Sequence, residues 1–398
     1  MQTNPHRWFG AGQSSAADAA KAGAEAAAEA IGGRPAKAVF VFCSVAYDLP
    51  ELLAAVRAEA GPEAAIVGTT TMGELGNAGM TVGGLAVAAL GGDGFTVHVR
   101  AAAIDPHDPR AAGAEAAEAL RGLHDPNRVL ILLCDGMADR PNDIVRGAYS
   151  AIGAAWPMVG GFGADDRHFE RTFQFCGAPN GDFGGDFGGD DVLTGSVVGL
   201  ALGSDGPIGI GMAHGWRRTE PPMIVTQSKG AHVYRLDDEP ALDVLLRRNH
   251  FDGTADEFFE RGRALQPLGL SRRNGEDIRV IHAGDDEERS VWGTADVPQG
   301  ALVWLMEADR QALLDGATWS CTEAIARLDG LAPLGVLAFD CGGRRAGLVE
   351  GGMQEEIDAM RTALSDAPFA GFYTTGEIAR VRGASGLHHL TLVTLALA

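Results

Sequence analysis

The segment Val39–Cys43 reads Val-Phe-Val-Phe-Cys, a short β-branched and aromatic run bounded by turn residues. Such a run predicts a strand that is buried on both faces. Apolar residues then recur on one side of a predicted helix over residues 49–60, and a second buried strand is expected at 65–68. A further apolar run at 85–90 closes this unit. The order of strand, helix and strand predicts a parallel, right-handed crossover.

The same order of segments occurs twice more along the chain. Cys43, Cys134 and Cys341 each stand at the end of the first strand of their unit, which supports a true structural repeat. The fold class expected from this pattern is α/β, with mixed sheets built from repeated β-α-β-β units and helices packed on them. The later segments are 129–134, 141–153, 157–165 and 196–202 in the second unit, and 334–341, 354–364, 370–378 and 389–397 in the third.

The remaining segments predict the other strands and two domains. The runs 95–99 and 208–214 closely follow closing runs, so each is expected to form an antiparallel hairpin with the run before it. A strand pair and a helix are expected within 223–248. An Ala-rich helix, capped by Ser14 or Ser15, is predicted at 14–30. The expected domains are an N-terminal helical segment 1–36 packed on a first domain 37–249, and a second domain 250–398, with the boundary in the polar stretch 249–256.

Composition narrows the class of partner and the compartment. The formal net charge of −21 disfavours binding to nucleic acid and to anionic membrane surfaces. The five cysteines are odd in number and widely spaced, which fits neither a disulfide framework nor a zinc site. No apolar stretch reaches the roughly 20 residues that span a bilayer, and no secretory signal is recognisable at the start. We therefore expect a cytoplasmic protein.

Candidate ligand-binding residues gather at the predicted carboxyl ends of the parallel strands, where ligands bind in open α/β sheets. Small residues there leave room for a ligand, and polar side chains offer directional partners. Glutamates and Arg344 together would suit an amino-acid-like zwitterion, with Arg344 as a fork for its carboxylate. The predicted contact set is Thr70, Thr71, Glu74, Gly161, Asp165, His214, Trp216, Asp340, Cys341, Arg344, Tyr373, Thr375 and Glu377.

Other interpretations of these residues remain open. The glycines and threonines could simply shape turns and cap helices, and Glu74 and Glu377 could make a shared structural hydrogen bond. His214 could contact a ligand, hold a metal or haem, or be a core imidazole. His388 and His389 open the predicted final strand, where alternation would send the two rings to opposite faces. The Gly/Asp-rich segment 177–191 predicts a flexible surface loop, with a calcium-binding turn as the alternative.

A catalytic role is the weaker interpretation, and the chain is not expected to be an enzyme. Cys341, with Arg344 nearby and a histidine from the last strand, could make a thiolate nucleophile. Cys43 and Cys134 occupy equivalent strand ends, however, as expected for small residues that fill a strand terminus. No Gly-x-Ser-x-Gly, P-loop, dinucleotide or His-Glu-x-x-His motif is present.

Several segments together resemble the FIST family, named for F-box and intracellular signal transduction proteins. The resemblance of the first half is carried by 66–74, Val159-Gly160-Gly161, Ala213–Trp216 and 225–243. The second half is similar to the FIST C domain through Phe339–Arg344 and Gly371–Ile378. The resemblance extends from about Lys37 to the end of the chain. One departure is His388-His389-Leu390-Thr391, where the family's final motif has a His-Asn-Thr character.

This resemblance implies a sensory module that binds a small molecule, with amino acids among the proposed ligands. Some relatives are similar to haem-based nitric oxide sensors, which makes His214, His388 and His389 the axial candidates if haem binds; otherwise no cofactor is expected. No kinase, cyclase or receptor segment is recognisable in the sequence. A signalling protein that is contacted in trans is therefore the expected partner.

Overall fold

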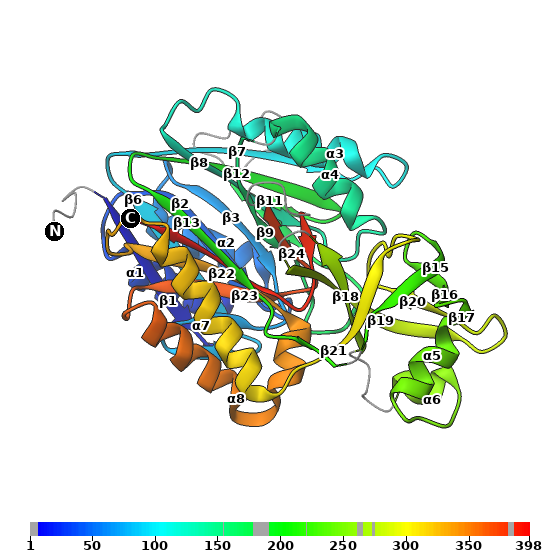
Figure 1. Cartoon of the computed structure of the whole chain (residues 1–398). Helices are drawn as coiled ribbons and strands as arrows, with labels where there is room; N and C mark the ends of the chain where they lie inside the picture. The colour runs from blue at the N-terminus through cyan, green and yellow to red at the C-terminus, as the bar shows by residue number, and fades with distance from the viewer. Residues whose placement is uncertain are drawn as a thin grey trace. The chain divides into compact units, whose positions relative to one another are not determined.

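The computed structural model describes residues 7–153, 155–177, 191–219, 221–260, 266–272, 275–380 and 386–398 (Figure 1). It divides into two compact units. The predicted loop or calcium turn at 177–191 lies almost wholly outside the described residues. The first unit comprises Met1–His214, Leu314–Leu387 and Thr391–Ala398, and the second comprises Gly215–Leu313 and His388–Leu390.

The chain contains three repeats, each ordered strand, helix, strand, helix and then four strands. The first consists of β1 (Trp8–Ser14), α1 (Ala19–Ile31), β2 (Ala36–Cys43), α2 (Leu49–Ala60), β3 (Ala65–Thr70), β4 (Glu74–Gly76), β5 (Gly79–Thr81) and β6 (Leu85–Gly91). The second consists of β7 (Phe95–Ala103), α3 (Pro109–Ala117), β8 (Asn127–Cys134), α4 (Pro141–Ile152), β9 (Met158–Phe162), β10 (Gln174–Gly177), β11 (Asp191–Leu193) and β12 (Ser196–Ser204), with a 3-10 turn at Glu118–Leu120 after α3. The third consists of β13 (Ile208–Ala213), α7 (Arg310–Ala326), β22 (Gly335–Cys341), α8 (Gly342–Ala363), β23 (Phe369–Thr374), β24 (Glu377–Arg380), β25 (Leu387–His388) and β26 (Leu392–Leu397).

Each repeat places four of its strands in the same spatial order. These orders are β1-β6-β2-β3, β7-β12-β8-β9 and β13-β26-β22-β23. In each repeat the two strands that flank the second helix are parallel, and the closing strand is antiparallel to the first of these two. This confirms the predicted α/β fold with mixed sheets. In each repeat the cysteine lies opposite a residue at the end of the parallel neighbouring strand: Cys43 opposite Thr70, Cys134 opposite Phe162 and Cys341 opposite Thr374.

The predicted local hairpins were wrong. The runs 95–99 and 208–214 do form strands, but β7 pairs with β12 and β13 pairs with β26. The neighbours of β6 are instead β1 and β2. Each of these runs opens the next repeat, so the short connection before it carries the chain from one sheet to another. Closeness in sequence therefore did not predict pairing.

Each sheet is extended by a strand from a different repeat. Strand β4 of the first repeat pairs with β23 of the third, β10 of the second pairs with β3 of the first, and β24 of the third pairs with β9 of the second. All three pairings are antiparallel. The exchange is cyclic, so no repeat has a complete sheet by itself.

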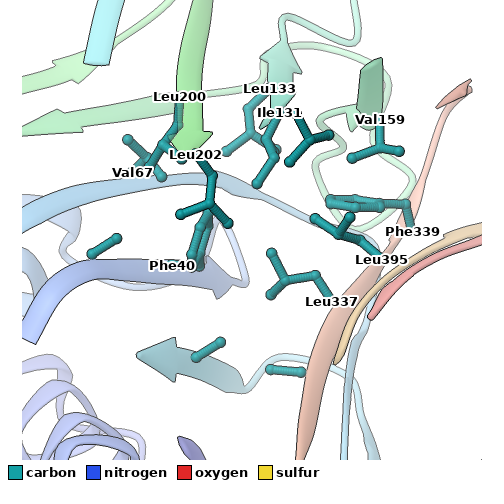
Figure 2. Packing of buried hydrophobic residues seen from close by; sticks show 14 of the residues in the cluster. Phe40, Val67, Ile131, Leu133, Val159, Leu200, Leu202, Leu337, Phe339 and Leu395 are labelled. Atoms are coloured by element: carbon teal, nitrogen blue, oxygen red, sulfur yellow. The ribbon is translucent and has the colours of Figure 1, made fainter. Parts of the chain in front are cut away.

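The three sheets share one hydrophobic core. Side chains from all three repeats meet there, including Phe40, Leu133 and Phe339 (Figure 2). Phe372 stacks on Phe42 with ring centroids 4.7 Å apart and meets Phe339 edge-on at 5.9 Å. Alternation along the strands directs these residues inward, because successive side chains of a strand point to opposite faces. The core therefore belongs to the assembly of repeats and not to any one of them.

Pairs of helices cover the sheets. Residues of α1 and α2 pack on the sheet of the first repeat, and residues of α7 and α8 pack on that of the third. Helices α3 and α4 approach each other closely at Gly113, where a Cβ atom would lie only 1.9 Å from the carbonyl oxygen of Ile144. Among the residues that the structure describes, no helix has both the length and the apolar character needed to cross a membrane.

Two predicted helix boundaries need correction. The first helix begins at Ala19 and is capped by Asp18, whose carboxylate accepts the N–H of Lys21 at 2.8 Å; Ser14 instead ends β1. Helix α8 begins at Gly342, directly after β22, and not at Gln354. The glycines of its first turns weakened the helical pattern in the sequence, because glycine disfavours helix interiors.

The second unit is inserted in sequence between β13 and α7. Its strands β21, β15, β16, β20, β19 and β18 pair in that order, and β18 pairs again with β21, so the described part forms a closed barrel. The barrel has its own core. Its elements are β14 (Arg217–Arg218), β15 (Met223–Lys229), β16 (His232–Leu236), β17 (Glu239–Pro240), α5 (Ala241–Arg248), α6 (Ala255–Glu260), β18 (Gln266–Arg272), β19 (Gly275–Asp285), β20 (Ser290–Gly293) and β21 (Leu302–Glu307).

The compact units and the expected domains follow different divisions of the chain. The expected boundary in 249–256 falls between α5 and α6, inside the second unit. The expected division into 1–36, 37–249 and 250–398 therefore stays a prediction about domains along the sequence. The spatial units arise because the third repeat resumes after the inserted barrel.

Replacing Phe372 by alanine is expected to destabilise the protein by about 3–5 kcal/mol, because it removes a fully buried ring from the shared core. Phe169→Ala is the matched control, since that ring is 63% exposed. Urea unfolding would give both free energies of unfolding. Similar losses for the two variants would contradict a core shared by the repeats.

Candidate functional site

The carboxyl ends of β3, β9 and β23 are joined by backbone hydrogen bonds. The N–H of Ala164 donates to the carbonyl of Thr70, that of Tyr373 to Gly73, and that of Phe162 to Gly376, each at 2.9 Å. These three bonds link the repeats pairwise in a closed cycle. We call the segments 70–73, 162–164 and 373–376 the strand-end ring.

Two repeats carry the same threonine–glutamate pair beside the strand-end ring. Thr71 Oγ1 donates to Glu74 Oε1 and Thr374 Oγ1 donates to Glu377 Oε1, both at 2.6 Å. The second carboxylate oxygen accepts a backbone N–H at 3.1 Å in each case, from Gly84 and Thr391 respectively. The structural hydrogen bond that the sequence left open is therefore present in both repeats.

Both glutamates are completely buried, and this shifts their ionisation. Burial raises the pKa of Glu74 to about 7 and that of Glu377 to about 8. The hydroxyl and backbone donors lower the pKa of each group without cancelling the effect of burial. The pKa values of both acids therefore lie near neutral pH, where an exposed glutamate is already ionised.

The second repeat departs from this pattern. Asp165 follows β9, and its carboxylate accepts the backbone N–H groups of the three residues 169–171 at 2.6–2.9 Å. The loop that it organises holds Asp166, Arg167 and Phe169 at positive φ. Such conformations cost about 1–3 kcal/mol each for residues other than glycine and persist only when the surroundings impose them. Ser44 Oγ anchors the loop by donating to Asp166 Oδ2 at 2.5 Å.

Arg344 is the centre of a fully buried network. Its Nε donates to Asp340 Oδ1 at 2.8 Å and its Nη2 donates to Glu356 Oε1 at 2.6 Å. Its Nη1 donates to the carbonyl oxygen of His214 at 2.7 Å, and the hydroxyl of Tyr373 donates to Glu356 Oε2 at 2.9 Å. The protein's own acceptors thus occupy the guanidinium fork that the sequence suggested for a ligand carboxylate.

The network holds two carboxyl groups against one guanidinium. Burial and the adjacent Glu356 raise the pKa of Asp340 well above its usual range, and Arg344 only partly offsets this. Asp340 Oδ2 accepts no hydrogen bond from the described residues. Sequence reasoning missed Glu356, because the predicted helix began only at residue 354 and gave no reason to direct this side chain inward.

The remaining predicted residues lie in different places. Thr70 Oγ1 accepts the N–H of Phe173 at 3.0 Å, and Thr375 Oγ1 donates to the carbonyl of Gly163 at 3.1 Å. Gly161 packs so closely that an added Cβ would lie 2.6 Å from Thr374. All the predicted contact residues except Trp216 belong to the first unit.

The paired histidines precede the last strand instead of opening it. Strand β26 begins at Leu392, because Leu390 has a φ of 55° that interrupts extended backbone. Both His388 and His389 are buried, so neither ring is directed into solvent. Burial, with Arg279 and the neighbouring histidines, lowers the pKa of His389 to about 3. No group of three or more metal-binding side chains occurs among the described residues.

The cysteines are all free and buried. Burial raises the pKa of Cys321 to about 12, and it also raises the pKa of Cys43 and of Cys134. The Cys341 thiol hydrogen-bonds to the Glu377 carboxylate and lowers the pKa of that glutamate. The three strand-end cysteines therefore fill equivalent sites in the fold.

Comparison with known proteins identifies the class of this fold. The FIST N domain matches residues 37–239, and the FIST C domain matches residues 241–380. Together these matches cover well over half of the chain, which therefore belongs to the FIST family. FIST domains are associated with sensing in signal transduction.

Two mycobacterial relatives are similar to part of the chain. The uncharacterized protein Rv0628c of Mycobacterium tuberculosis is 29% identical over 209 residues, which are 50% of this chain and 53% of the relative. The uncharacterized protein Mb0898c of Mycobacterium bovis is 28% identical over 211 residues, with the same shares covered. The chain spans about half the length of the curated relatives it matches.

The buried glutamates predict a stability that falls from acidic to mildly alkaline pH. An acid whose pKa is raised by folding stabilises the protein most below its unfolded pKa of about 4.3, and this contribution is lost as pH rises through the folded value. The relevant window ends near pH 7 for Glu74 and near pH 8 for Glu377. Urea unfolding between about pH 5 and about pH 9 should show a smaller loss of stability for Glu74→Gln and for Glu377→Gln than for the original protein. An unchanged slope in both variants, matching the exposed control Glu59→Gln, would contradict this.

Removing the Arg344 side chain is expected to destabilise the protein by about 3–5 kcal/mol, because Asp340 and Glu356 would remain buried without their cation. The control is Arg327→Ala, which breaks a more exposed ion pair with Glu323 and should cost less than about 1 kcal/mol. Chemical unfolding measures both changes. Equal, small effects would show that the network contributes little to folding.

Proposed function

We propose that this chain is a free-standing cytosolic sensory protein that binds a small metabolite, an amino acid or a similar molecule, and signals through a partner protein in trans. Membership of the FIST family supports the sensory class. One observation carries the proposal further: buried ionisable groups are concentrated beside the strand-end ring. Glu74, Glu377, Asp340, Arg344 and Glu356 are all fully buried there or in the adjoining network.

Burying charged groups in this way lowers the stability of the fold, so a role other than stability would explain why they are present. A buried ion pair is frequently no more stabilising than well-packed apolar residues of similar volume. Strongly shifted pKa values also cluster at functional sites. Glu74, Glu377 and Asp340 all have raised pKa values. A ligand that carries an ammonium group would favour their ionised forms, and so would be sensed through their protonation.

The ligand approaches from the side of the ring that solvent reaches. Thr375 is partly exposed, and Gly136 packs against it so closely that an added Cβ would lie 2.9 Å from Thr375 Oγ1. His214 is also partly exposed, and its carbonyl already contacts Arg344. In this proposal the ligand contacts Thr375, Gly136 and His214, and it does not contact the buried acids directly.

The arrangement of strands supports a route for the signal. The strand-end ring joins all three repeats, and the exchanged strands β4 and β24 start directly after its segments, whereas β10 starts at Gln174. A ligand that alters one hydrogen bond of the ring therefore acts on two sheets at once. Such a change would alter a surface that a signalling partner contacts.

The first experiment is a thermal-shift screen against amino acids, nucleotides, short organic acids, divalent metals and haemin, followed by calorimetry on the hit. A ligand at about 100 times its dissociation constant adds roughly 2.7 kcal/mol of stability, which is readily seen as a higher Tm. A selective response to amino acids or related zwitterions supports the proposal. A response to haemin alone, or none at all, would overturn it.

Thr375→Val is expected to weaken binding of the hit by about tenfold, because it removes one hydrogen-bonding hydroxyl and keeps the side-chain shape. Thr322→Val is the matched control, since that threonine is exposed on α7. Calorimetric titration of both variants measures the dissociation constants. Equal affinities would remove Thr375 from the site.

A further inference from the structure

A polar pocket lies in the first unit between the end of β1, the beginning of α1 and the β4–β5 hairpin. Its volume is about 520 Å³, and it is more open to solvent than an enclosed cavity would be. None of its lining residues belongs to the predicted contact set or to the strand-end ring. The polar side chains that line it are Gln13, Ser14, Ser15, Lys21, Glu25 and Thr81, and two alanines complete the wall.

The walls of this pocket are held in place before any ligand binds. Gln13 bridges to the hairpin, since its Nε2 donates to the Gly79 carbonyl and its Oε1 accepts the Ala78 N–H, both at 3.0 Å. Ser14 Oγ donates to Glu25 Oε2 at 2.8 Å. A site whose polar groups are already ordered loses less entropy on binding. The polar groups of Gln13, Ser14 and Glu25 are therefore ordered before a ligand binds.

The lining selects against a net charge on the ligand. Lys21 and Glu25 form an ion pair at 3.7 Å, so the two charged groups of the wall neutralise each other. The other polar groups are hydroxyls and an amide, which both donate and accept hydrogen bonds. No aromatic or large apolar side chain is among the lining residues. A ligand with many hydroxyl groups and no net charge matches this surface.

Thr81 links the pocket to the strand-end ring. It lines the pocket, and its Oγ1 donates to Glu74 Oε2 at 2.9 Å. Glu74 begins β4, which pairs with β23 of the third repeat. A ligand hydroxyl that competes for Thr81 would remove a donor from Glu74. Since that donor lowers the pKa of Glu74, its loss would favour uptake of a proton.

We propose that this pocket is a second binding site, separate from the one placed at the strand-end ring, and that it takes a small, uncharged, polyhydroxylated molecule. The hydroxyl of Thr81 carries the occupancy of the pocket to Glu74. The site is independent of Thr375, so its existence does not require the proposed function. Its effect on the sensor does rest on that function.

The test is calorimetric titration with myo-inositol, ribose, glucose and glycerol, with succinate, putrescine and glycine as charged or zwitterionic comparisons. Polyols at high concentration stabilise proteins generally by exclusion from the surface, so only saturable binding counts. Ser15→Phe fills the pocket, and Ala17→Phe is the matched control because it is exposed on the same turn and does not line the pocket. We expect saturable polyol binding that is at least about tenfold weaker in Ser15→Phe and unchanged in Ala17→Phe, a loss of about 1.4 kcal/mol.

The outcomes separate the parts of the proposal. Binding of glycine or of the charged compounds alone would overturn the assigned ligand class, and polyol binding that survives Ser15→Phe would overturn the location. Titration at pH 7 in buffers of different ionisation enthalpy reports the proton uptake; loss of that uptake in Thr81→Val supports the relay, and its absence in the original protein overturns it. If polyol binding is weakened by Thr375→Val but not by Ser15→Phe, the proposed function remains intact and this second site is removed.

Discussion

The structure of the first unit depends on the cyclic exchange of strands among its three repeats. Because β4, β10 and β24 each complete the sheet of another repeat, a single repeat leaves a strand edge unpaired and its contribution to the shared core exposed. Exposed edges and apolar faces are unfavourable in water. The repeats are therefore stable only together, and the strand-end ring is the place where their backbones are joined.

This constraint explains why polar groups are buried where they are. Strand ends that meet at a junction of three sheets leave backbone N–H groups that must find acceptors, since an unsatisfied buried donor costs about 1–3 kcal/mol. Glu74 and Glu377 accept the N–H groups of Gly84 and Thr391 as well as neighbouring hydroxyls. The acids thus satisfy the junction, and their raised pKa values are a consequence of that position.

The sequence indicated the repeats because each contains a continuous apolar strand that ends in cysteine, namely β2, β8 and β22. It failed where the decisive contacts are distant along the chain. Nothing near residues 95–99 indicates that their partner strand lies about a hundred residues further on, at β12. For the candidate site, the equivalence of Glu74 and Glu377 was visible as a repeated motif. Glu356 was not, because its partner Arg344 lies in a glycine-rich helix start that resembles a loop.

The three repeats are equivalent in scaffold and different in chemistry. The first and third repeats have a threonine–glutamate pair, whereas the second repeat has Asp165 and a loop with backbone at positive φ. The Arg344 network is formed in the third repeat, and the polar pocket beside Thr81 in the first. Symmetry alone would have kept all three sites alike, because the same backbone junction must be satisfied in each. The departures therefore give the three repeats different chemistry at equivalent positions of the scaffold.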